Sequence, residues 1–244
     1  FFFKQKTAYE IPKRDWSSDV CSSDLQFSLV VDSSGADSIR SVFCDSTGSV
    51  YIAGFYPAGT TPTIKFVNSS NVSTDVATLP TAVGTANVFL SKFSSTGVYQ
   101  YSRVMNCYLN SFTVTLAVNK ADEVYLCCGY NGTPILYSVT SSNVTSTIRT
   151  LPASLGISAA IVTKFNSTGT YMYSRIVDNP NGIGSSDIGY GVTCDSVYNK
   201  VYMCGKIYQD SAFIKDENNN TLGILPAGTQ DTGFLIKFND NGNL

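Results

Sequence analysis

The residues best suited to bind a ligand recur at the same place in two copies of a repeated segment. Each copy carries two tyrosines and an arginine, spaced two residues apart on a predicted strand: Tyr99, Tyr101, Arg103, Tyr171, Tyr173 and Arg175. Because side chains alternate along a strand, we expect the three residues of each copy to share one face. The rings would stack on a sugar and the guanidinium would hold its polar groups. Alternatively, the six residues pack one repeat against the next, with the tyrosine hydroxyls reaching water or backbone.

A lysine also recurs in three copies beside apolar neighbours, as Lys92, Lys164 and Lys237. One interpretation is a ring of lysines that faces a channel and attracts an anion. The other is that each lysine lays its aliphatic stem on apolar surface, or caps a turn carbonyl of the adjacent repeat. We favour the second interpretation.

Oxygen-rich turns are the candidate metal ligands. Asp45, Asn119 and Asp195 open the first turn of each copy, and 239–242 (NDNG) is another such turn. Calcium needs several oxygens at a fixed spacing, as in D-x-D-x-D-G, and that pattern is absent. Bonds from these side chains to their own turn backbone suffice to explain them, so no metal site is predicted.

The sequence offers little for catalysis. It has no histidine, which removes the ordinary nucleophile–base dyad, and no two carboxylates form a pair on one predicted strand. Cys127 and Cys128 lie in an apolar strand, where burial raises the pKa of a thiol and leaves it inert. The glycines of 182–191 are not followed by a helical pattern, so they predict no phosphate-binding loop. We predict no catalytic residue, no cofactor and no enzyme activity.

Cysteines and glycosylation sequons bear on the compartment. Beyond residue 25 there are six cysteines, which are either small buried apolar residues or partners in disulfides: Cys44, Cys107, Cys127, Cys128, Cys194 and Cys204. Six N-x-[ST] sequons are present, against about four expected by chance: Asn68, Asn71, Asn131, Asn143, Asn166 and Asn219. This excess favours a secreted or cell-surface protein.

Composition excludes two classes of partner. The chain is rich in Ser, Thr, Asn, Gly, Tyr and Val, which favours strands and turns over helices. Its formal net charge is −2 and no lysine or arginine cluster occurs, which argues against nucleic acid. No apolar run approaches the ~18–20 residues of a membrane-spanning helix.

Residues 1–25 differ from the rest of the chain. They hold eight of its thirty-four charged residues and its only tryptophan, Trp16. No apolar periodicity organises them, and they contain no apolar core typical of a secretory signal. The stretches KQKTAYEI and DWSSDVCSSDL resemble the in-frame translation of a sequencing-library adapter. We therefore treat 1–25 as a non-native segment, expect it to be disordered, and exclude it from the fold argument.

The remaining residues are built from internal repeats. CDSTGSVYIAG (44–54) recurs as VNKADEVYLCC (118–128) and CDSVYNKVYMCG (194–205). FLSKFSSTGVYQYSRV (89–104) recurs as IVTKFNSTGTYMYSRI (161–176) and as FLIKFNDNGNL (234–244). The three lysines named above are 72 and 73 residues apart, and the equivalent valines, Val50, Val124 and Val201, are 74 and 77 apart. A period of this length indicates one supersecondary unit per copy.

Each copy predicts four antiparallel strands. The first two are short β-branched and aromatic runs joined by a polar turn. The second pair is joined by a turn with Gly97, Gly169 or Gly242 at the position that needs a positive φ. We expect an extra hairpin between the second and third strands, since 63–80 in the first copy fits neither pair. One unit cannot bury its own faces, so the copies must stack.

The pattern D-x-x-x-x-V-Y-x-x-G followed by F-[LI]-x-K-F-x-x-x-G resembles the SBBP repeats of seven-bladed β-propellers, over about residues 26–244. Two departures are Cys128 in place of the glycine, and Tyr101 or Tyr173 in place of the usual tryptophan. The resemblance implies an all-β fold, a partial β-propeller of about three four-stranded antiparallel blades, each with the extra hairpin, truncated at both ends. At roughly 73 residues per blade, this is about three-sevenths of a ring.

The resemblance also implies the domain organisation and the function. We expect the end of a preceding blade over 26–40, blades over about 41–107 and 112–179, and a truncated blade over about 189–244, which the remaining blades of the full-length chain complete. The expected function is a non-catalytic scaffold that binds a protein or a glycan through loops at one end. The alternatives are part of a propeller enzyme whose channel site lies mostly in missing blades, and a structural repeat of an adhesion protein.

Overall fold

The computed structural model describes residues 26–108, 113–180, 186–195, 197 and 199–244. The predicted non-native segment 1–25 lies outside the described residues. The described part contains seventeen strands, β1 to β17, and no helix. It therefore includes no helix that could cross a membrane. All pairings between these strands are antiparallel, and the all-β prediction is confirmed.

Three repeat units share one strand order, in which each strand pairs with the next core strand along the chain. Unit 1 consists of β2 (Ser38–Cys44), β3 (Val50–Pro57), β6 (Ala86–Phe93) and β7 (Tyr99–Tyr108). Unit 2 consists of β8 (Val114–Val118), residues 124–130 of β9 (Val124–Thr140), β11 (Ala159–Phe165) and β12 (Tyr171–Asp178). Unit 3 consists of β13 (Ile188–Asp195), β14 (Lys200–Tyr208) and β17 (Asp231–Asn239).

A hairpin lies between the second and third strands of each unit, but it pairs with the sheet that precedes its own unit. The hairpin β4 (Thr63–Asn68) and β5 (Ser73–Thr78) pairs with β1 (Phe27–Asp32), and we call these three strands the leading sheet. The second hairpin, residues 131–140 of β9 with β10 (Thr145–Thr150), pairs with β7 of unit 1. The third hairpin, β15 (Ala212–Asp216) and β16 (Thr221–Leu225), pairs with β12 of unit 2.

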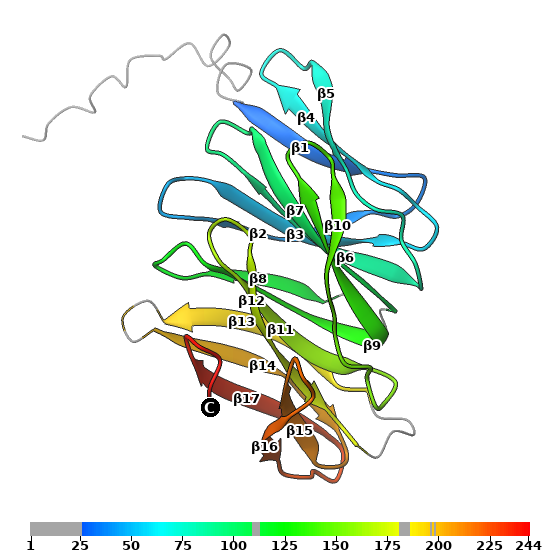
Figure 1. Cartoon of the computed structure of the whole chain (residues 1–244), viewed down its shortest axis with the longest axis vertical. Coiled ribbons are helices and arrows are strands. Elements are labelled where there is room, and N and C mark those ends of the chain that lie inside the picture. Colours follow the sequence, from blue (N-terminus) through cyan, green and yellow to red (C-terminus); the bar gives the residue numbers. More distant parts are fainter. Residues whose placement is uncertain (1–25, 109–112, 181–185, 196, 198) are drawn as a thin grey trace, which may run out of the picture.

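Strand β9 ties two sheets together. Its 17 residues run without a break from unit 2 into the hairpin on unit 1, so the two sheets form one hydrogen-bonded network of 11 strands. Figure 1 shows the successive sheets arranged along the long axis of the molecule, from the leading sheet to unit 3.

The apolar core forms three layers, each between two successive sheets. The layer between the leading sheet and unit 1 includes Ile52, Ile64, Leu79 and Phe89. The layer between units 1 and 2 includes Tyr51, Leu90, Leu126 and Ile161. The layer between units 2 and 3 includes Tyr125, Val162, Met203 and Phe234. Unit 2 is therefore buried on both faces, and unit 1 is buried on the face towards unit 2 and, over β3 and β6, on the face towards the leading sheet.

The turn between the third and fourth strands has the predicted geometry. Gly97, Gly169 and Gly242 have φ angles of 82°, 81° and 77°. In the first of these turns the Gly97 N–H donates to the Ser94 carbonyl at 2.9 Å. A side chain at these positions would be strained, so the prediction of glycine with a positive φ is confirmed.

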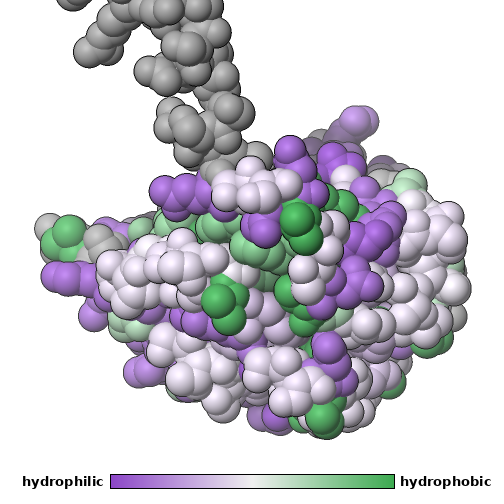
Figure 2. All heavy atoms as spheres, turned by 90° about the horizontal axis from the view of Figure 1, so that it is seen from above, coloured by the Kyte–Doolittle hydropathy of each residue, from purple (hydrophilic) through white to green (hydrophobic). Residues whose placement is uncertain are grey.

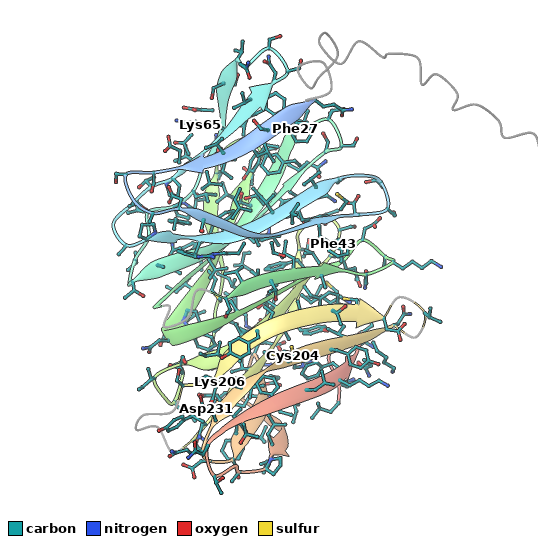
Figure 3. All side chains as sticks on the ribbon, turned by 180° about the vertical axis from the view of Figure 1, so that it is seen from behind. Phe27, Phe43, Lys65, Cys204, Lys206 and Asp231 are labelled. Carbon is teal, nitrogen blue, oxygen red and sulfur yellow. The ribbon has the colours of Figure 1, made fainter. Side chains whose placement is uncertain are left out.

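The exposure of one repeated core position shows whether a neighbouring unit covers that face of the sheet. Leu90, Val162 and Leu235 are equivalent, yet their exposed fractions are 0%, 1% and 69%. Units 1 and 2 present this position to the next unit, whereas unit 3 presents it to solvent. Figure 3 labels Cys204 and Lys206 on the same open sheet.

The opposite end of the molecule is also open. Val42 on β2 is 63% exposed, although its equivalent Leu116 in unit 2 is 6% exposed. Figure 2 views the molecule from this end and shows apolar side chains among polar ones. Both ends thus expose positions that are buried wherever a further unit is present.

The five cysteines whose side chains the structure describes form no disulfide, and the side chain of Cys107 lies outside that description. Cys127 and Cys128 are buried on β9, Cys194 is half-buried, and Cys44 and Cys204 are exposed. Burial raises the pKa of the Cys127 thiol to about 12. These positions therefore act as small side chains within or beside the core layers.

Substitution of Leu90 tests the layered core. We expect Leu90→Ala to lower the free energy of unfolding by about 2–5 kcal/mol, because it leaves a cavity between units 1 and 2. The control Leu235→Ala should change it by less than about 0.5 kcal/mol, because that side chain is exposed. Urea denaturation followed by far-UV circular dichroism measures both. Equal losses would contradict the assignment of the two faces.

Candidate functional site

The six predicted ligand residues lie on the last strands of units 1 and 2, at equivalent positions: Tyr99, Tyr101 and Arg103 on β7, and Tyr171, Tyr173 and Arg175 on β12. The prediction that each trio shares a face is wrong. Phe93 pairs with Tyr99 but the adjacent Lys92 pairs with Tyr101, so a β-bulge lies between the tyrosines. Tyr99 joins the layer on the leading-sheet side, and Tyr101 joins the layer between units 1 and 2. Unit 2 contains the same bulge.

Five of these six residues are buried, and Tyr171 is half-buried. Arg103 lies over the ring of Tyr101, with 4.4 Å from Cζ to the ring centroid, and Arg175 lies over Tyr173 at 4.5 Å. Burial raises the pKa of Tyr101 to about 12 and lowers the pKa of Arg103. In both pairs a guanidinium group therefore covers a face of the tyrosine ring inside the protein.

The two arginines hold a turn of the next unit. Arg103 Nε donates to the Gly169 carbonyl at 2.6 Å, and Arg175 Nε donates to the Gly242 carbonyl at 2.5 Å. A Cβ at Gly169 would lie 2.5 Å from Arg103 Nη2, so the glycine is needed for the approach as well as for its φ angle. We call this contact the arginine–turn contact.

The lysines act on the same turns. Lys92 Nζ donates to the Ser167 carbonyl at 3.1 Å and pairs with Asp45 at 3.1 Å. Lys164 Nζ donates to the Asp240 carbonyl at 3.0 Å and pairs with the Asp240 carboxylate at 2.9 Å. The interpretation of a lysine that caps a turn of the adjacent repeat is confirmed for these two.

The acidic partner of Lys92 is a turn residue with several donors. Burial alone would raise the pKa of Asp45, but hydrogen bonds from Thr47, Lys92 and Ser49 outweigh burial and lower it to about 2. Asn119 and Asn239 likewise accept bonds from backbone N–H groups of their own turns. The described residues contain no group of three or more His, Cys, Asp or Glu side chains placed to hold a metal ion.

A pocket opens where the second hairpin meets unit 2. Its volume is about 340 Å³, and it is lined by Arg103, Ser138, Ile148, Gly169, Thr170 and Tyr171. Two of the six predicted ligand residues, one from each unit, therefore meet here. The volume lies at the lower end of the range for small-molecule sites.

The pocket exists because one hairpin residue is small. Ser138 pairs with Arg103, and the equivalent residue of the first hairpin, Phe66, pairs with Leu29. The Phe66 ring covers the equivalent turn so closely that a Cβ at Gly97 would lie 2.4 Å from it. Serine in place of phenylalanine thus removes the ring that would fill the space.

The third hairpin places a carboxylate beside the equivalent arginine. The Glu217 carboxylate accepts a bond from Arg175 Nη1 at 2.8 Å, so the second guanidinium has a partner within the chain. The three hairpins therefore differ at equivalent pairing positions, which hold Phe66, Ser138 and Asp216, and only the third adds a carboxylate, Glu217, on the arginine.

The walls of the pocket are fixed before any ligand binds. The Tyr171 ring packs edge-on against Phe165, with centroids 6.2 Å apart, and lies beneath Arg149 at 5.7 Å. Its hydroxyl donates to Ser174 Oγ at 3.2 Å, while burial raises its pKa to about 12. An aromatic ring, a guanidinium and two hydroxyl groups suit a small polar group such as one sugar residue.

The junction between units 2 and 3 contains a second group of charged residues, besides Lys164 and Asp240. Asp187 is fully buried; its Oδ1 accepts the Tyr208 N–H at 3.1 Å, and its Oδ2 has no partner among the described residues. Asp178 pairs with Lys215 at 3.3 Å. Burial raises the pKa of both carboxyls, that of Asp187 to about 7, and the charge of Asp178 adds to the shift at Asp187.

The sequence did not identify Ser138, Ile148 and Thr170 as pocket residues, nor Asp178 and Asp187 as a buried pair. The difference between Phe66 and Ser138 was the available signal for the pocket. It becomes informative only once the two hairpins are aligned through their pairing with the preceding sheet.

No family model matches this chain, and no curated protein matches it.

Removal of a lysine tests the contact with the next turn. Lys164→Met leaves Glu123 and Asp240 without their cation, and because both carboxylates are partly exposed we expect a loss of about 1–3 kcal/mol in unfolding free energy. The equivalent Lys237→Met, on the open face of unit 3, should cost less than about 0.5 kcal/mol. Thermal and urea denaturation measure both, and an equal effect would contradict a role of Lys164 in joining units.

Asp187 predicts a pH dependence of stability. The pKa of Asp187 rises from 3.8 to about 7 on folding, so the folded state favours the protonated carboxyl. The stability of the fold is therefore unaffected by this group below pH 4 and falls as the pH rises towards and through 7, because the buried carboxyl must then ionise. We expect Asp187→Asn to raise the stability above that of the parent at pH 8, by on the order of 4 kcal/mol at most, with little difference at pH 4. Urea unfolding at several pH values measures this difference, which should grow with pH; a constant difference would contradict the assignment.

Proposed function

We propose that the three units are part of a β-propeller of SBBP type. The successive antiparallel sheets, packed face to face so that unit 2 is covered on both sides, support this proposal. So do the open faces at both ends, which carry residues that are buried at equivalent positions. Further units of the same kind would cover both faces.

On this scaffold, we propose that the chain is a non-catalytic binding protein of the cell exterior whose ligand is a sugar residue of a glycan. The single observation that carries this proposal is the pocket beside Arg103 and Tyr171, which Ser138 keeps open. The two side chains come from different units, so packing of the units fixes their relative position. No pair of acid and base faces this pocket, which favours binding over chemistry.

A purely structural repeat is the second candidate. It is favoured by the burial of five of the six predicted ligand residues in contacts between or within units. The two candidates differ in one respect: only the binding protein needs the pocket to be open.

Filling the pocket separates these functions. We expect the whole chain to bind members of an array of immobilised oligosaccharides, and Ser138→Phe to weaken that binding at least about tenfold, because the ring occupies the space as Phe66 does in the first hairpin. The control Ser141→Phe, at the exposed tip of the same hairpin, should bind like the parent.

Two results would overturn the binding function. If the parent chain binds no oligosaccharide, the structural repeat remains. If Ser138→Phe binds as tightly as the parent, the ligand lies elsewhere on the molecule. Circular dichroism on both variants establishes that the fold is intact.

A further inference from the structure

The three added hairpins end in turns of the same shape. In each turn, the N–H of an asparagine donates to the carbonyl three residues earlier, at 3.0, 3.0 and 3.1 Å. These residues, Asn71, Asn143 and Asn219, have φ angles of 59°, 59° and 68°, and all three are exposed. They therefore lie at equivalent, exposed tips, although the Asn143 Oδ1 also accepts the Thr78 N–H of β5 at 3.1 Å.

Each of these asparagines begins an N-x-[ST] sequon. The hydroxyl residues two positions later, Ser73, Thr145 and Thr221, are the first residues of β5, β10 and β16, and they are also exposed. Acceptor asparagines for N-linked glycans occur in accessible surface loops with this spacing. All three copies thus meet the sequence requirement at one structural position.

Turn geometry alone does not require asparagine there. Glycine adopts a positive φ at least as readily, and the turn between the third and fourth strands uses glycine in all three units. The hairpins use asparagine in all three copies, each followed by the required hydroxyl residue. Since the turn accepts either residue, the sequon gives a reason for asparagine at all three tips.

The other three sequons are placed differently. Asn166 is half-buried, and its Oδ1 accepts the N–H groups of Thr168 and Thr170 within a turn that Lys92 holds. Asn68 is half-buried and bonds its own turn in the same way. Asn131 is half-buried within β9. These three side chains are part of the fold.

We propose that Asn71, Asn143 and Asn219 carry N-linked glycans. The Asn Nδ2 would form a bond to the anomeric carbon of an oligosaccharide linked to a lipid diphosphate. The carbon–oxygen bond to the diphosphate breaks, the lipid diphosphate leaves, and the amide loses one proton. This inference rests on the exterior location proposed above, but not on the pocket.

The glycans would lie at the ends of exposed sheet edges. In the described chain, β5, β10 and β16 each pair with one strand only, so each is an edge strand, and on β5 the last residue, Thr78, donates its N–H to Asn143 Oδ1. Such edges can pair with another molecule, and a bulky hydrophilic group at the start of the strand would hinder that pairing. The position of the sequons thus gives the modification a physical role.

The test is secretion of the whole chain from cultured mammalian cells behind a heterologous signal peptide. Both the cell lysate and the medium are digested with peptide-N-glycosidase and mapped by mass spectrometry. We expect glycans at the three tips, and loss of one glycan in each of Asn71→Gln, Asn143→Gln and Asn219→Gln. Thr145→Val and Thr221→Val keep the asparagine and the turn, and each should also lose one glycan.

The control is Asn166→Gln, which should leave the glycan pattern unchanged. Unmodified tips in the translocated chain would overturn the proposal, as would glycans on Asn166 in place of the tips. The oligosaccharide array, repeated on deglycosylated chain, reports on the pocket separately. If the three asparagines carry no glycan but the chain still binds the array, this inference is refuted and the proposed binding function is retained.

Discussion

The fold depends on one constraint: a sheet that is apolar on both faces can be buried only between two other sheets. Unit 2 satisfies it fully, since core layers cover both of its faces, and unit 1 satisfies it except around β2, where Val42 is exposed. Unit 3 satisfies it on one side, and Leu235 is exposed where Leu90 and Val162 are buried. Stability is therefore a property of neighbouring pairs of units, as in other repeat proteins.

The contacts between lysine or arginine and the next turn set the register in which the units pack. An apolar layer is non-directional, but a guanidinium that reaches one carbonyl fixes the position of the next sheet. The β-bulge before Tyr101 makes this contact possible, because it directs Tyr101 and Arg103 towards unit 2 while Tyr99 covers the other layer. Gly169 completes the contact by leaving room for Arg103.

These features separate what the sequence could predict from what it could not. Strands, turn glycines and the repeat period follow from local patterns, and Gly97, Gly169 and Gly242 were assigned from their turns alone. Simple alternation placed Tyr99 with Tyr101, and it failed because a bulge leaves no signature in the spacing of apolar residues. The sequence also could not predict which sheet each hairpin pairs with, since an alternating strand such as 63–68 can pair with either neighbouring sheet. The pocket depends on that pairing, so it could not be located either.

Hairpin residues outside the core layers can differ between the copies without loss of the packing between sheets. The core strands of each unit must fit two neighbours, which restricts positions such as Leu90 and Val162 to apolar residues. A hairpin pairs with the last strand of the preceding sheet, and its equivalent positions there hold Phe66, Ser138 and Asp216, which differ in chemistry. Because each hairpin is covalently part of the next unit, the site it forms always joins two units. Variation of hairpin residues therefore alters the surface of a junction while the layers beneath it keep their packing.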